Sequence, residues 1–343
     1  MKKIKKPSDI KIGVIGYGGA YNMGRHHIKE IMLTGAIPCA VAEVDPARRK
    51  VATEDFPHIE TYSTVEEMLK KSEANIITII TPHNTHADIA LKCLRAGRNV
   101  VCEKPLAITT AECDAMIAAA KKADVMLSTY HNRHWDGVIL NAMKLLNEGQ
   151  IGDVYRVEAH MGAYGKPGDW WRSSKSISGG ILYDFGVHLL EYSLQILNDD
   201  FTEVSAYAKK GYWAPQTAWK KDGNEDEVEV MVRFAKGGWL SLNITHLDSN
   251  PKRGIMEVTG TKGSMVMDWG FVEVTNIMDG KTTITRYSNP EAQWPKYYQN
   301  VVDHLVKGSK LIITSEWSRR PIHILDSAEQ SVKKGTAIRT KYH

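Results

Sequence analysis

Hydrophobic and polar positions alternate with two different periods along this chain of 343 residues. In the first third, short apolar runs alternate with segments whose apolar residues recur about every three to four positions, as in helices. The runs predict strands at Lys11–Ile15, Ile37–Glu43, His58–Tyr62, Asn75–Thr81, Asn99–Cys102 and Val125–Ser128. Helices are predicted at Met23–Leu33, Ala47–Thr53, Thr64–Lys71, Thr85–Arg95 and Ala111–Lys122. Strands that alternate with helices indicate a doubly wound parallel sheet.

The pattern changes after residue 130. A helix ending at Leu146, a strand at Tyr155–Met161 and a helix over Gly179–Tyr192 are followed by consecutive extended runs. These runs are Glu203–Lys209, Glu227–Phe234, Trp239–His246, Gly254–Thr259, Gly263–Asp268, Phe271–Ile277 and Thr282–Tyr287. Tight turns such as Asp279-Gly280 join them as hairpins. Two helices, Glu291–Val306 and Pro321–Lys334, close the chain.

We therefore expect an α/β protein with two domains. Residues 1–130 would form a Rossmann-type parallel sheet, and residues 131–343 an α+β domain with a large open, mainly antiparallel sheet. All nine tryptophans lie from Trp135 onward, which supports a boundary near residue 130. The run Leu240, Leu242 and Ile244 predicts an apolar sheet face. We expect the outer face to pair between subunits of a homo-oligomer, a dimer or tetramer.

Composition excludes several classes of protein. Hydrophobic residues make up 43% and charged residues 24% of the chain, and a net charge of +4 is too small to indicate a nucleic-acid partner. No apolar stretch approaches the roughly 18 residues of a membrane span. The four cysteines have no metal-ligand spacing. We expect a cytoplasmic protein with free thiols, no membrane partner and no bound metal.

A glycine-rich turn follows the first predicted strand. Its sequence is Gly16-Tyr17-Gly18-Gly19-Ala20-Tyr21-Asn22-Met23-Gly24. Dinucleotide-binding turns follow G-x-G-x-x-G, because glycines let the backbone approach a pyrophosphate. Gly16 and Gly18 match, whereas Tyr21 stands at the third position, so a lengthened turn would give that role to Gly24. Glu43 follows 19 residues later, near the interval of about 20 expected for an acid that binds the ribose.

The choice of dinucleotide depends on the charges near this turn. The carboxylate of Glu43 would accept hydrogen bonds from ribose hydroxyls and repel a 2′-phosphate, which favours NAD. Arg48 and Arg49 follow closely and would instead favour NADP. We expect NAD, with NADP less favoured.

Asp184 and His188 are the strongest candidates for chemistry in the second half. On a helix, residues four apart share a face, with Cβ atoms about 5–6 Å apart. A carboxylate beside an imidazole orients a histidine for proton transfer. The simpler interpretation is a helix with two unrelated polar residues, and His188 would then be a buried core histidine.

Several motifs follow one another along the chain. They are Gly24-Arg25-His26-His27, Ala42-Glu43-Val44-Asp45-Pro46, Thr81-Pro82-His83-Asn84-Thr85-His86, Glu103-Lys104-Pro105, Asn132-Arg133 and Gly179-Gly180 with Asp184-Phe185-Gly186-Val187-His188. In this order they resemble the motifs of the Gfo/Idh/MocA family of oxidoreductases. The resemblance covers nearly the whole chain. It implies a cleft between the two domains and a catalytic set of Lys104, Asp184 and His188. The lengthened glycine turn and Glu43, where aspartate is more usual, depart from the family pattern.

With this resemblance, we expect two sets of binding residues. The cofactor set is Gly16, Gly18, Gly19, Ala20, Tyr21, Asn22, Met23, Glu43, Thr81, Pro82, Asn84, His86, Glu103, Lys104, Asn132 and Trp171. The substrate set is Lys104, Arg133, His160, Tyr164, Trp171, Arg172, Asp184 and His188. Trp170, Trp213 and Trp219 could add apolar faces and Lys175 a donor, although each tryptophan could equally cover a domain or subunit interface.

The expected reaction is hydride transfer between a secondary alcohol of a sugar, cyclitol or glycoside and a nicotinamide. His188 would take the hydroxyl proton, Asp184 would orient it or bind a neighbouring hydroxyl, and Lys104 would stabilise the alkoxide. Lys104 could instead be a surface residue. Two other functions use the same residues. One is a redox-neutral reaction, in which transient oxidation allows elimination, epimerisation or glycoside cleavage and NAD is recycled. The other is a catalytically silent protein that binds cofactor or sugar.

Overall fold

The computed structural model describes residues 4–340, which form two compact units. Unit 1 comprises the residues up to Asn132 together with Pro295–Arg320, and unit 2 comprises Arg133–Trp294 and the residues from Pro321 onward. The expected boundary at residue 130 is close to the first division. However, residues 295–320, which we expected in the second domain, belong to unit 1.

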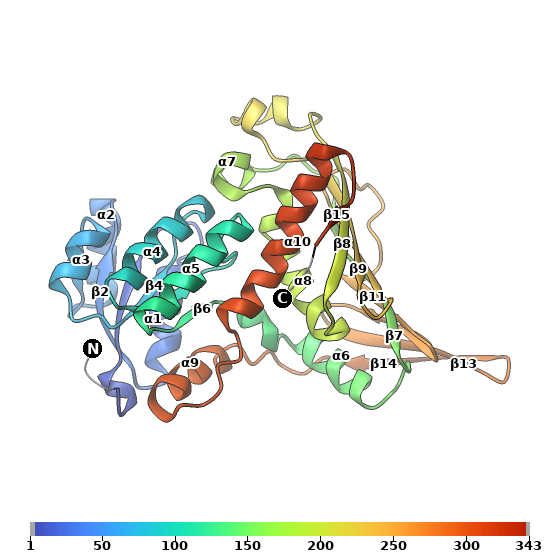
Figure 1. Ribbon diagram of the computed structural model, residues 1–343, viewed down its shortest axis with the longest axis horizontal. Coiled ribbons are helices and arrows are strands. Elements are labelled where there is room, and N and C mark those ends of the chain that lie inside the picture. The colour runs from blue at the N-terminus through green and yellow to red at the C-terminus, as the bar shows by residue number, and fades with distance from the viewer. Residues whose placement is uncertain (1–3, 341–343) are drawn as a thin grey trace. The chain divides into compact units, whose positions relative to one another are not determined.

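Unit 1 is built on a six-stranded parallel sheet (Figure 1). Its strands are β1 (Lys11–Ile15), β2 (Ile37–Ala42), β3 (Glu60–Tyr62), β4 (Ile76–Ile79), β5 (Asn99–Cys102) and β6 (Leu127–Thr129). The order β3-β2-β1-β4-β5-β6 reverses direction between β1 and β4. Ligands of such sheets bind at the carboxyl ends of the strands, at this switch point. The predicted Rossmann sheet is confirmed.

The helices of unit 1 are α1 (Met23–Met32), α2 (Pro46–Asp55), α3 (Val65–Lys71), α4 (His86–Arg95), α5 (Thr110–Ala123) and α9 (Lys296–Lys307). Buried tyrosines hold α9 to the rest of the unit. The Tyr298 hydroxyl lies 2.6 Å from His27 Nδ1, and the Tyr297 hydroxyl lies 2.8 Å from Ser128 Oγ. Since α9 completes this core from a distant part of the chain, its position could not be predicted from local periodicity.

Unit 2 is built on a nine-stranded sheet in the order β14-β13-β12-β11-β7-β10-β9-β8-β15. The strands are β7 (Val154–Gly162), β8 (Phe201–Lys209), β9 (Glu227–Phe234), β10 (Trp239–Thr245), β11 (Met256–Gly260), β12 (Gly263–Met267), β13 (Phe271–Met278), β14 (Lys281–Ser288) and β15 (Ile338–Arg339). Strands β7 and β10 pair in parallel, whereas their neighbours in the sheet pair antiparallel. The predicted large, mainly antiparallel sheet is confirmed.

The helices of unit 2 are α6 (Gly137–Asn147), the short α7 (Lys175–Ser178), α8 (Gly186–Leu197) and the part of α10 (Ser315–Lys334) that follows Pro321. Helix α8 covers one face of the sheet, because a Cβ on Gly186 would lie 3.5 Å from Leu242 and 3.6 Å from Ile244. Helix α10 lies against β8, where the Ser331 hydroxyl accepts a hydrogen bond from the Ala206 amide at 3.0 Å. The opposite face, called the open face below, exposes alternate residues such as Tyr207 and Met231.

Three helix predictions were wrong at their starts. The helix expected over Glu291–Val306 begins only at Lys296, after Pro295, because the residue before a proline disfavours helical backbone. The expected helix over Gly179–Tyr192 is interrupted, since Gly179 and Gly180 have φ of +90° and +131° and a short 3-10 helix, η5 (Ile181–Tyr183), precedes α8. Helix α10 begins at Ser315 rather than at Pro321, which lies inside it. Proline favours the first turn of a helix, so the pattern indicated a start where the helix in fact continues. In the part of the chain described, no helix is both long and apolar enough to cross a membrane.

Candidate active site

The glycine turn of unit 1 has the close packing that a dinucleotide site needs. Gly16 directly follows β1 and has φ of +96°, and a Cβ there would lie 2.4 Å from the Ile80 carbonyl oxygen. A Cβ on Gly24 would lie 2.7 Å from the Tyr17 ring, so Gly24 takes the packing role of the third glycine. A Cβ on Gly18 would have no atom within 4 Å, and Tyr21 is 56% exposed. The turn therefore presents open backbone at the start of α1.

Glu43 and Arg48 hold this turn from the side. The Glu43 carboxylate accepts hydrogen bonds from the Tyr17 amide at 2.6 Å and from the Asp45 amide at 3.0 Å. Arg48 Nε donates to the Tyr17 carbonyl at 2.8 Å, and its guanidinium lies 2.9 Å from where a Cβ of Gly19 would stand. Arg49, in contrast, donates to the backbone carbonyls of Glu43 and Val44. Of the two arginines, Arg48 is therefore the one at the glycine turn.

The loops that follow β4 and β5 are tied together by His86. Its ring nitrogens lie 2.7 Å from the Pro105 carbonyl oxygen and 2.8 Å from that of Thr81, and burial lowers its pKa. Because both nitrogens have backbone partners, His86 supports the loops and offers no nitrogen to a cofactor. Thr81 and Pro82 are half-buried and Asn84 is exposed, so these three remain available at the strand ends.

Glu103 supports the backbone of Lys104. One carboxylate oxygen lies 3.0 Å from His27 Nε2, and the other accepts a hydrogen bond from the Lys104 amide at 2.9 Å. Burial of Glu103 opposes its ionisation, but the hydrogen bond from His27 and the charges of His27 and Lys104 outweigh burial and lower its pKa. Glu103, expected as a cofactor residue, thus positions the Lys104 loop. The Lys104–Pro105 peptide is cis.

In unit 2, Asp184 and His188 flank the start of α8. Asp184 follows η5, and its side chain is 38% exposed. His188 is in the first turn of α8 and is 5% exposed, with its ring centroid 5.5 Å from that of Phe185. The pair thus occupies a helix start rather than the middle of one helix face, and Asp184 has the greater access to solvent.

Arg172 connects Asp184 with the aromatic loop. Its Nη1 lies 3.0 and 3.1 Å from the two carboxylate oxygens of Asp184. Its Cζ lies 5.0 Å from the ring centroid of Trp170 and 5.1 Å from that of Trp171. These distances are typical of cation–π contacts. An ion pair and half-buried indole rings therefore adjoin the carboxylate that we expected to act on substrate.

A second cation–π cluster includes a residue that sequence reasoning missed. Arg133 pairs with Asp136 at 2.8 Å, and its Cζ lies 5.3 Å from the Phe185 ring and 5.6 Å from the Trp269 ring. Trp269 is 47% exposed, in the turn between β12 and β13. Its own neighbours in sequence give no functional signal, because the sheet alone brings this turn to Arg133 and Phe185.

Three expected substrate residues lie elsewhere in unit 2. His160 stands opposite Asn243 in the β7–β10 register, whereas Leu242 and Ile244 face α8, so His160 is on the open face. Tyr164 joins Tyr212, with hydroxyls 2.7 Å apart. Lys175 pairs with Glu225 and Glu329, which take two of its three N–H donors. His160 and Tyr164 thus lie on other elements than the Asp184–Arg172 pair, and Lys175 is bound to two carboxylates.

The parallel sheet, its glycine turn and the acid at the end of β2 define unit 1 as a dinucleotide-binding domain. Residues 10–131 match the family described as "Oxidoreductase family, NAD-binding Rossmann fold" (GFO_IDH_MocA), and residues 139–266 match the GFO/IDH/MocA C-terminal domain. The chain belongs to the GFO/IDH/MocA family and is an oxidoreductase with an NAD-binding domain.

Named relatives cover most of the chain. scyllo-Inositol 2-dehydrogenase (NADP(+)) IolW of Bacillus subtilis is 23% identical over 98% of this chain and 98% of its own length. Myo-inositol 2-dehydrogenase of Thermotoga maritima is 29% identical over 76% of this chain and 75% of its own length. Other alignments span as little as 54% of the relative's length. A structure of levoglucosan dehydrogenase with NADH and levoglucosan has a TM-score of 0.82 at 22% identity and covers 96% of this chain and 99% of that one, which shows the same fold.

Proposed function

We propose that this protein is an NAD-dependent dehydrogenase that transfers hydride between a nicotinamide and a secondary alcohol of a sugar, cyclitol or glycoside. The observation that carries the proposal is the placement of Asp184 and His188 at the start of α8, with Arg172 bound to the Asp184 carboxylate. Family relatives named as cyclitol dehydrogenases support the same class of substrate.

The cofactor would bind at the glycine turn and the ends of β2, β4 and β5. Gly16, Gly18, Gly19, Ala20 and Asn22 would hold the pyrophosphate, and the carboxylate of Glu43 would accept from a ribose hydroxyl. Glu43 already binds two backbone amides, but each carboxylate oxygen accepts more than one hydrogen bond. We therefore propose NAD as the cofactor, although the guanidinium of Arg48 could pair with the 2′-phosphate of NADP.

In the proposed mechanism, His188 accepts the proton of the substrate hydroxyl. A bound nicotinamide supplies the hydride acceptor. Histidine side chains commonly accept protons in steps of this kind. Lys104 places positive charge beside the developing alkoxide. Asp184, held by Arg172, binds a hydroxyl next to the reacting carbon or orients His188.

Aromatic and cationic side chains of unit 2 would form the substrate surface. Trp171 is half-buried and Trp269 is exposed. Arg172 lies against the Trp171 ring, and Arg133 lies against the Trp269 ring. Indole faces fit the C–H faces of sugars and cyclitols, while guanidinium groups donate to hydroxyls. Tyr164 and His160 fall outside this set because of their positions.

We also propose that the open face pairs with a second copy of the chain. Met231 and Tyr207 are 37% and 74% exposed on alternate positions of neighbouring strands, next to half-buried Trp239. Covering such residues would remove apolar surface from water. Light scattering at micromolar protein should give a mass at least twice that of the monomer, and a monomeric mass would contradict the pairing.

The activity is tested with a panel of myo-inositol, scyllo-inositol and levoglucosan, each with NAD and with NADP. The proposal predicts that reduced nicotinamide accumulates with at least one member of the panel and faster with NAD. Substrate turnover without accumulation of reduced cofactor would support the redox-neutral reaction instead. Cofactor binding with no turnover on a broader panel of sugars would support a silent binding protein.

A further inference from the structure

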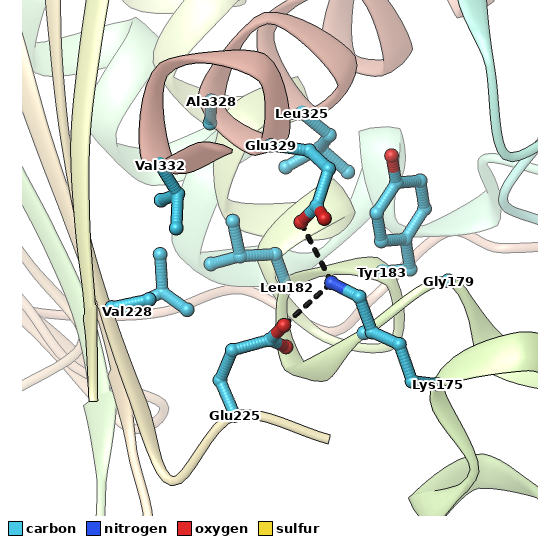
Figure 2. A pocket seen from close by; sticks show the side chains of 12 residues that line it. Lys175, Gly179, Leu182, Tyr183, Glu225, Val228, Leu325, Ala328, Glu329 and Val332 are labelled. Carbon is cyan, nitrogen blue, oxygen red and sulfur yellow. Dashed lines mark hydrogen bonds and ion pairs between the residues drawn. The ribbon is translucent and has the colours of Figure 1, made fainter. Parts of the chain in front are cut away.

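A half-buried cluster of charges contacts the turn that precedes Asp184. Lys175 Nζ donates to Glu225 at 2.5 Å and to Glu329 at 2.7 Å, as Figure 2 shows. The three residues, called the Lys175 cluster below, come from α7, from the segment before β9 and from α10. Their side chains are only 24%, 11% and 26% exposed, and the cavity around them has room for about one water, near 10 Å³.

The cluster contacts the Gly179–Gly180 turn directly. A Cβ on Gly180 would lie 2.9 Å from Glu225 Oε2 and 2.9 Å from Lys175 Nζ. The same Glu225 oxygen accepts a hydrogen bond from the Ile181 amide at 3.3 Å. Gly180 also has φ of +131°, a conformation that L side chains rarely adopt. The backbone at Gly180 therefore packs directly against the charged atoms of Lys175 and Glu225.

The short 3-10 helix η5 connects the Gly179–Gly180 turn to Asp184. Ile181 begins η5, the Tyr183 amide donates to the Gly180 carbonyl at 3.1 Å, and Asp184 directly follows η5. Arg172 donates to the Asp184 carboxylate. A shift of the Ile181 backbone would therefore move the Asp184 carboxylate relative to His188, which lies in the first turn of the next helix, α8.

A role limited to folding does not explain the location of the cluster. The other Glu329 oxygen pairs with Lys333 at 3.2 Å, and the Lys333 side chain is 70% exposed, so α10 has an ordinary surface ion pair as well. Burial of a lysine and two carboxylates is costly unless their geometry is satisfied, and replacing such groups by apolar residues is often neutral or stabilising. A half-buried charge cluster at this turn is consistent with a requirement for fixed geometry.

We propose that Lys175, Glu225 and Glu329 are positioning residues, which hold the Gly179–Gly180 turn so that Asp184 reaches the substrate in its working orientation. The inference rests on the proposed function, because it assigns Asp184 to the reaction. None of the three residues is proposed to contact substrate or cofactor.

The test compares Lys175→Met and Glu225→Ala with Glu225→Gln, which keeps an acceptor for the Ile181 amide. Lys333→Met is the matched control, since it removes only the exposed pair. With the best substrate of the inositol and levoglucosan panel, kcat should fall by about 10²-fold in Lys175→Met and Glu225→Ala, as for an active-site displacement of about 1 Å. The kcat of Glu225→Gln should lie between that of these two variants and that of wild type. KM for NAD should be unchanged in all four, and Lys333→Met should keep wild-type kcat.

Crystal structures of Glu225→Gln and Lys175→Met provide a readout that does not depend on turnover. The Asp184 carboxylate should be displaced from its wild-type position, most in Lys175→Met. A lowered melting temperature with wild-type kcat and an unmoved Asp184 would overturn the inference and leave the cluster a structural role. Asp184→Asn separates the two proposals. If it retains turnover, the assignment of Asp184 fails. If it loses turnover while the cluster variants do not, only the positioning role fails.

Discussion

The two units place their candidate functional residues in different ways. In unit 1, the glycine turn, Glu43, the Thr81 loop and Lys104 each follow a strand of one parallel sheet, so the topology gathers them at its carboxyl edge. In unit 2, Asp184 and His188 are close in sequence, but the residues around them come from distant segments. Arg172, Glu225, Trp269 and Glu329 all reach this region from other elements.

This difference separates what topology determines from what packing determines. A strand followed by a glycine turn and a helix is a local signal. Parallel pairing of the strands then brings their carboxyl ends to one edge of the sheet. The start of α8 is defined by side chains whose partners are set only after the large sheet has formed. We therefore expect substitutions at the glycine turn and at Glu43 to alter cofactor use, and substitutions around α8 to alter turnover.

The largest expected effect is that of His188→Ala. Removal of the group that accepts the hydroxyl proton should lower kcat by at least about 10²-fold. NAD affinity, measured by calorimetry, should remain near that of wild type because the cofactor turn lies in unit 1. Wild-type turnover in this variant would remove His188 from the mechanism, and a parallel loss of NAD affinity would contradict a role limited to proton transfer.

Cofactor choice should respond to the charge on Glu43. Glu43→Gln keeps an acceptor for the Tyr17 amide but removes the carboxylate charge that would oppose a 2′-phosphate. The ratio of kcat/KM for NADP to that for NAD should rise about tenfold. Arg48→Met, made in both backgrounds, should lower NADP use. An unchanged ratio in Glu43→Gln would show that this carboxylate does not face the ribose.

The support of the Lys104 loop predicts a pH-dependent stability. The pKa of Glu103 in the folded protein lies below its ordinary value of 4.5, so the unfolded chain binds more protons near that pH. Stability from this group is therefore complete above about pH 5 and decreases as the pH falls through the folded pKa. Glu103→Gln should cost about 1–3 kcal/mol at neutral pH.

Calorimetric melting temperatures of wild type and Glu103→Gln, measured from neutral pH to about pH 4, check this prediction. The difference between the two proteins should become smaller as the pH decreases. A difference that is constant over this range would mean that the ionised carboxylate does not contribute through its bond to His27.

An effect similar in size to that of Glu103→Gln is expected at one of two glycines near Asp184. Gly180→Ala would place a Cβ 2.9 Å from two charged atoms at φ of +131°, and such strain should cost about 1–3 kcal/mol. Gly186→Ala is the control, because its nearest contacts are at 3.5–3.6 Å and its effect should stay within about 0.5 kcal/mol. Urea unfolding compares the two. Equal losses would mean that the Gly180 turn is not constrained as described.

Much of the fold followed from periodicity, and the exceptions have physical reasons. The six strands of unit 1 and seven consecutive strands of unit 2 were predicted close to their observed bounds, since alternation is a local property. The return of α9 to unit 1 depends on the buried contacts of Tyr297 and Tyr298, and the break at Gly179 and Gly180 on their positive φ. Neither is visible in the spacing of apolar residues.

The candidate site was predicted unevenly for the same reason. Gly16, Gly24 and Glu43 lie where the motif placed them. Residue type alone could not show that His86, Glu103 and Lys175, which we expected to bind cofactor or substrate, also bind protein groups. Trp269 was missed because its partners Arg133 and Phe185 lie in other segments.

The most direct test of the central claim follows the hydride itself. Perdeuterated myo-inositol, scyllo-inositol and levoglucosan are each incubated with NAD and the wild-type protein, and NMR then detects deuterium on the nicotinamide. The account predicts transfer of deuterium to the nicotinamide from at least one of these alcohols, and at least about 10²-fold slower transfer in His188→Ala. Tight NAD binding without deuterium transfer from any of them, or equal transfer in His188→Ala, would contradict it.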